Sequence, residues 1–135
     1  MFELPRELYS ASSIAENKHI VPSTSGYDFS FAIKLPSSTE TREGPQTLTL
    51  LQIGKTGNLR SRITKNHLGN ALGSSVLMKK IHDALLENKD GCKVGSMDVS
   101  GWILENVYFG WIEDRVSPEG RCALIEHFNP RLNLR

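Results

Sequence analysis

The sequence predicts an α+β domain in which helices pack on a small antiparallel sheet. Two observations predict this class, and a third indicates the number of domains. Residues 27–35 alternate apolar and polar side chains, as a strand with one buried face does. Residues 58–68 and 74–88 instead repeat apolar side chains at helical spacing. A length of 135 residues, with 39% hydrophobic and 23% charged residues, indicates one soluble globular domain.

The first half of the chain contains a predicted hairpin. Residues 1–25 form a polar N-terminal extension with room for a short helix over 4–15, and a single domain covers 26–135. Tyr27, Phe29 and Phe31 share one face of a half-buried strand. Residues 36–46 form a turn-rich, mobile connection, and residues 47–53 form a second strand that Gly54 ends.

The second half begins with two predicted helices. One helix covers 58–68, and a second begins at Ser74 or Ser75, either of which can cap it, and continues to about residue 88. A polar loop over 88–100 precedes a long strand over 101–112 that contains both tryptophans. Ser117-Pro118 is typical of a helix start, and Pro130 stops this last helix. The predicted order is β-β-α-α-β-α, with a three-stranded sheet.

Several classes of protein do not fit this composition. The longest strongly apolar stretch, 102–112, is too short to span a bilayer, so we expect no membrane contact. The N-terminus has no basic start followed by an apolar run, so we expect no secretory signal. Cys92 and Cys122 are too few for a disulfide framework, and without an export signal we expect reduced thiols in a cytoplasmic protein, with a single disulfide as the alternative. Neither cysteine has a partner at zinc spacing, so we expect no zinc site.

One segment of the chain carries only positive charges. No acidic residue lies between Glu43 and Asp83, although the net charge of the chain is only +1. Such a segment suggests a surface that meets an anion, most simply a nucleic-acid backbone. The alternative is a solvated helical face. The basic residues of the segment are Lys55, Arg60, Arg62, Lys65, Lys79 and Lys80.

Two stretches carry a resemblance to a known family. Residues 50–63 read LLQIGKTGNLRSRI, and residues 123–133 read ALIEHFNPRLN. Both resemble motifs of the GIY-YIG nuclease superfamily, in which an essential arginine lies eight residues after a glycine, as Arg62 follows Gly54. The chain departs from the family at Gln52, where the family has tyrosine, and at Arg121, where the family's metal-binding glutamate usually lies.

The resemblance implies a metal-dependent endonuclease that hydrolyses DNA phosphodiester bonds. Arg62 would stabilise charge on the phosphate, because a planar guanidinium holds two phosphate oxygens at once. Lys55 would be a general base or a phosphate contact, and Tyr27 would orient water or belong to the core. His67 would act as base or phosphate contact, or be a solvated histidine at a helix end.

The implied cofactor is Mg²⁺ or Mn²⁺, which needs a carboxylate ligand. Glu119, from an irregular first turn made flexible by Gly120, is the expected ligand, and Glu126 is the alternative. Nucleic-acid contacts are expected from Arg60, Lys65, Lys79, Lys80 and Asn133.

Two other functions remain open. The departures at Gln52 and Arg121 favour a degenerate relative that binds nucleic acid without cutting it. A protein-interaction module on the same fold is the third interpretation, because a fold alone does not determine a function. The expected partner is DNA, with specificity supplied by loops, by a homodimer or by a partner protein.

Overall fold

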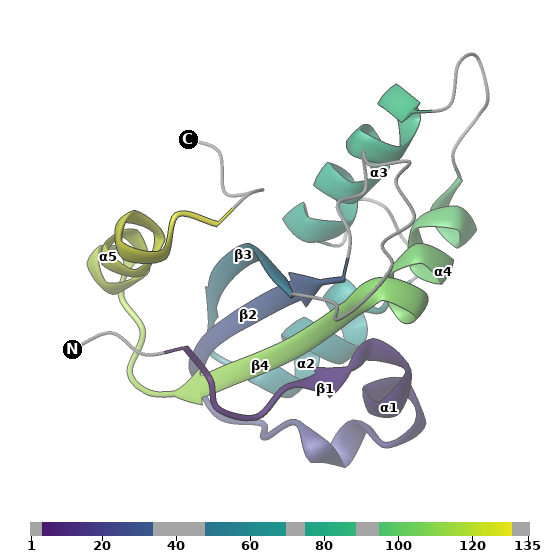
Figure 1. The fold of residues 1–135 in the computed structure, drawn as a ribbon. Helices are drawn as coiled ribbons and strands as arrows, with labels where there is room; N and C mark the ends of the chain where they lie inside the picture. The colour runs from purple at the N-terminus through teal and green to yellow at the C-terminus, as the bar shows by residue number, and fades with distance from the viewer. Residues whose placement is uncertain (1–3, 34–47, 70–74, 89–94, 131–135) are drawn as a thin grey trace.

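A computed structural model describes residues 4–33, 48–69, 75–88 and 95–130 of the chain (Figure 1). It is an α+β structure built around a four-stranded antiparallel sheet with strand order β1-β4-β2-β3. The strands are β1 (Tyr9–Ser10), β2 (Gly26–Ala32), β3 (Thr49–Thr56) and β4 (Val107–Glu113). The expected α+β class is therefore confirmed, and the expected number of strands is wrong.

Helical segments cover both faces of this sheet. They are α1 (Ala11–Glu16), the 3₁₀ turn η1 (Lys18–Ile20), α2 (Leu59–Ser61), the π-helical turn η2 (Arg62–His67), α3 (Val76–Asn88), α4 (Ser96–Asn106) and α5 (Pro118–Phe128). Figure 1 shows α5 on the opposite side of the sheet from α3 and α4. No helix in the described part of the chain is long and apolar enough to cross a membrane.

The fourth strand comes from the N-terminal extension. Tyr9 of β1 pairs with Phe109 of β4, so residues 9–10 belong to the sheet and not to a helix over 4–15. The helix α1 begins only at Ala11, where the Ser10 side chain accepts a hydrogen bond from the Ser13 amide. Ala11 and Ile14 then enter the same core as β4.

The central strand β2 is buried on both faces, not on one as expected. Tyr27, Phe29 and Phe31 do share a face, and they pack with Leu124 and Ile125 of α5. The other face lies under a second core, which contains Ala32 of β2 and side chains from α2, η2, α3 and α4. The polar residues on this face of β2, Asp28 and Ser30, are therefore buried and do not contact solvent.

The prediction for residues 96–106 is wrong. Instead of a loop to residue 100 and a strand from 101, the structure has α4, and β4 begins only at Val107. The Asp98 carboxylate accepts a hydrogen bond from the Gly95 amide, which fixes the helix start. Val99, Ile103 and Asn106 are all buried. They are four and three residues apart, the spacing of side chains that share one face of a helix.

The other helix starts agree with the sequence. The Asn58 side chain accepts from the Ser61 amide, and Ser75 Oγ accepts from the Met78 amide at 3.0 Å. At α5, Ser117 is the cap and Pro118 the first helical residue. Three predictions concern residues outside the described part of the chain, namely the loop 36–46, Cys92 and Asn133. Cys122, in α5, is free and exposed.

Candidate functional site

Arg62 lies across the last part of β3, above Gly54. Its Nε is 3.4 Å from Oδ1 of Asp28, which is the residue opposite Gly54 in the sheet. A Cβ atom at position 54 would be 2.7 Å from Arg62 Nη2 and 2.7 Å from Asp28 Oδ1. Glycine is therefore the residue that lets the guanidinium and the carboxylate meet over the strand.

His67 holds the other oxygen of the same carboxylate. Its Nε2 is 2.7 Å from Asp28 Oδ2, and both side chains are almost completely buried. Because an ionised carboxylate only accepts hydrogen bonds, Nε2 carries the proton in this contact. The His67 ring also stacks on Phe109, with centroids 5.6 Å apart. The expectation of a solvated histidine at a helix end is therefore wrong.

The π-helical turn explains how both Arg62 and His67 reach Asp28. In an α-helix, two residues five apart point about 140° away from each other. Here the Leu68 amide donates to the Ile63 carbonyl, five residues earlier, at 3.0 Å. This wider turn brings residues i and i+5 to the same side of the helix.

Asp28 is ionised in this arrangement. Burial by itself raises the pKa of the Asp28 carboxyl. The hydrogen bond from His67, the electrostatic interaction with its ring and the positive charge of Arg62 outweigh that effect, and they hold the pKa of the Asp28 carboxyl below its usual value. The result is a charged cluster in which Arg62, with a side chain 25% exposed, is the member that reaches solvent.

Tyr27 lies on the opposite face of the sheet from Arg62. Its hydroxyl accepts a hydrogen bond from the Ser117 amide at 3.2 Å. A Cβ atom at Gly120 would overlap this hydroxyl, so the glycine makes room for Tyr27. The expected irregular start of α5 is wrong, because Ser117 Oγ caps the helix by accepting from the Gly120 amide.

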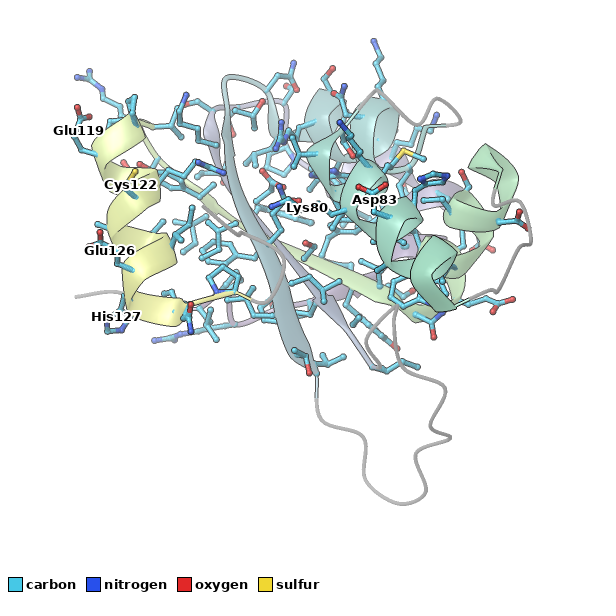
Figure 2. The ribbon with its side chains drawn as sticks, turned by 90° about the horizontal axis from the view of Figure 1, so that it is seen from above. Lys80, Asp83, Glu119, Cys122, Glu126 and His127 are labelled. Atoms are coloured by element: carbon cyan, nitrogen blue, oxygen red, sulfur yellow. The ribbon has the colours of Figure 1, made fainter. Side chains whose placement is uncertain are left out.

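The carboxylates expected to hold a metal do not fit a site beside Arg62. Figure 2 shows Glu119 and Glu126 on the side of α5 that is turned away from β3. Asp28 is already engaged by Arg62 and His67. Within the described ranges, no group of three or more His, Cys, Asp and Glu side chains could hold a metal ion. This arrangement offers a divalent cation no carboxylate from α5.

The basic residues divide into two groups. Arg60 is tied to the N-terminal segment, because its Nε donates to the Val21 carbonyl at 2.8 Å. Lys55, Lys65 and Lys79 are exposed. The exposure of Lys55 removes the burial on which a general-base role depended, and it leaves the phosphate-contact alternative in place.

Lys80 of α3 is close enough to Arg121 of α5 to be affected by its positive charge. Partial burial lowers the pKa of the Lys80 ammonium, and the positive charge of Arg121 lowers it further. Figure 2 shows Lys80 between α3 and β3. Two cationic groups from different helices thus lie near the strand that carries Gly54.

Sequence reasoning missed Asp28. Its place between aromatic residues of an alternating strand indicated a solvent-facing side chain, and only burial of both faces changes that interpretation. Gln52 lies on the same side of the sheet, opposite Ser30, and is 2% exposed. The signal that could have identified Asp28 is Gly54, which lies opposite it and leaves space for it.

Comparisons of the chain with family models, with curated proteins and with solved structures found no match.

Proposed function

We propose that this chain is a cytoplasmic protein that binds the phosphodiester backbone of DNA at the Arg62 end of β3. The observation that carries the proposal is the guanidinium of Arg62, which lies over Gly54 beside the buried carboxylate of Asp28, in a side chain that is 25% exposed. A fixed guanidinium can bind two phosphate oxygens at once. The proposal also rests on the resemblance of residues 50–63 to the GIY-YIG motif.

The charges around Arg62 support an anionic partner. Lys55 and Lys65 are close to Arg62 in the sequence, and both are exposed. Lys80 of α3 and Arg121 of α5 add positive charge near β3. Arg121 takes the position at which the family's metal-binding glutamate usually lies. The geometry therefore supports binding of a phosphate backbone better than it supports a metal site.

A binding titration tests this proposal. We expect the affinity for duplex DNA to fall linearly with salt on logarithmic axes. Replacing Lys65, Lys79 and Lys80 by glutamine should weaken binding equally for all sequences. It should also reduce the salt slope by about one unit for each lost phosphate contact. An unchanged slope, or no binding by the wild-type protein at low salt, would refute it.

Hydrolysis of DNA is the second candidate function. It is favoured by the spacing of Gly54 and Arg62 and by the contact between them. Plasmid nicking with added Mg²⁺ or Mn²⁺ tests it, and Arg62→Ala should then lower the rate by about a hundredfold or more. If Glu119→Gln abolishes nicking, Glu119 is a metal ligand after all. If nicking survives Glu119→Gln and is abolished by Glu126→Gln, the metal ligand is Glu126.

A further inference from the structure

We propose that Asp28 and His67 are positioning residues, which hold the guanidinium of Arg62 in the orientation that binds a phosphate group. This inference rests on the proposed function, because it assigns Arg62 to the phosphate contact. It adds two buried side chains that touch neither DNA nor solvent but decide how the exposed one is presented.

The first step of the argument is the edge of Arg62 that Asp28 occupies. The carboxylate lies beside Nε, at 3.4 Å, and Nη2 lies over Gly54. A guanidinium has two donor edges, one with Nε and one with the two terminal nitrogens. With the Nε edge directed at Asp28, the terminal edge is left for an incoming anion.

The second step is how Asp28 itself is held. His67 Nε2 binds Oδ2 at 2.7 Å, and the His67 ring is 0% exposed and nearly parallel to Phe109, at 8°. Asp28 therefore has one oxygen fixed by a rigid ring. Its other oxygen has no hydrogen-bond partner among the described residues, and neither does Arg62 Nε. These two unpaired atoms are neighbours, 3.4 Å apart, so each is the other's charged partner in the cluster.

The opposite role for Asp28 is a competing anion. A carboxylate next to Arg62 neutralises part of its charge, and its removal would then strengthen DNA binding. Positioning predicts the reverse, because a released guanidinium loses the orientation needed for a two-point contact. The sign of the change in affinity therefore separates the two roles.

The experiment uses the full chain with two pairs of variants. Asp28→Asn is compared with Glu105→Gln, which removes the same charge from an exposed position in α4. Glu105 lies two residues before β4 begins at Val107, which is at the other end of the sheet from Asp28. His67→Leu is compared with His67→Gln, whose amide can still donate to Asp28. Two readouts are taken, the Kd for a DNA duplex and the ¹Hε–¹⁵Nε signal of Arg62 by NMR.

We expect Asp28→Asn and His67→Leu to weaken DNA binding about tenfold, the usual size for loss of one charged contact. Both variants should also shift the Arg62 Nε signal. His67→Gln should recover most of the affinity and the signal, and Glu105→Gln should change neither. If Asp28→Asn does not fold, the His67 pair still decides the question.

Three results would overturn the proposal. They are tighter DNA binding by Asp28→Asn, an Arg62 Nε signal identical in wild type and His67→Leu, and equal losses in His67→Leu and His67→Gln. Failure of the proposed function is a different result, in which the wild-type protein binds no DNA at all. The Nε signal would then still report whether Asp28 and His67 hold Arg62.

Discussion

Replacing Gly54 by alanine should disrupt the ion pair that lies above it. The added Cβ would be 2.7 Å from both Arg62 Nη2 and Asp28 Oδ1, so each atom must move by about 0.7 Å to reach ordinary contact distance. Overpacking of this kind costs about 1–3 kcal/mol, and weakening of a buried charged contact adds to it. We therefore expect Gly54→Ala to lower the free energy of unfolding by about 2–4 kcal/mol.

Urea denaturation measures this loss, with Gly57→Ala as the matched control. Gly57 has no atom within 4 Å of its Cβ position, so that variant should stay within about 0.5 kcal/mol of wild type. In an Arg62→Ala background the cost of Gly54→Ala should fall, because one of the two crowding atoms is gone. Equal losses for the two glycine variants would refute the reasoning.

Three further predictions follow from contacts in the structure. Because the pKa of Asp28 is lowered, its ionised form stabilises the fold above the unfolded pKa. This stability should be lost as the pH falls below about 4, and Asp28→Asn should flatten that acid limb in melts measured against pH. Gly120→Ala should destabilise the protein by about 1–3 kcal/mol through overlap with the Tyr27 hydroxyl. Tyr27→Phe should recover part of that loss, and a double variant no more stable than Gly120→Ala would contradict the contact. Ser117→Ala removes the cap of α5 and should cost about 1 kcal/mol by thermal melting. No change in the melting temperature would show that this cap contributes nothing.

Local signals in the sequence identify the segments around the proposed site well. The apolar run that ends at Gly54, the cap at Asn58 and the helical spacing after it give β3 and the helix that carries Arg62. Ser75 and Ser117-Pro118 likewise mark two helix starts, because a capping side chain and a proline act within one turn.

Features that depend on distant contacts could not be predicted in the same way. β1 is two residues long and exists through its pairing with β4, so its own sequence carries little strand signal. Residues 101–106 are apolar enough for a strand. In the structure they continue a helix whose start is capped by the Asp98 carboxylate, which accepts from the Gly95 amide. Asp28 resembles a surface residue until helices are placed on both faces of β2.

The π-helical turn between Arg62 and His67 makes the length of this segment as important as its composition. Such a turn is equivalent to one residue inserted into an α-helix. Removing one residue from positions 64–66 would place the histidine four residues after the arginine, which is the spacing of neighbours on an ordinary α-helix. The contact with Asp28 can therefore be made in two ways, by a π-helical turn with the two residues five apart or by an α-helix with them four apart. A point substitution cannot convert one into the other, because they differ by one residue in length. A search for related chains should therefore allow a gap of one residue at this position, between an arginine and a histidine that both face a strand carboxylate.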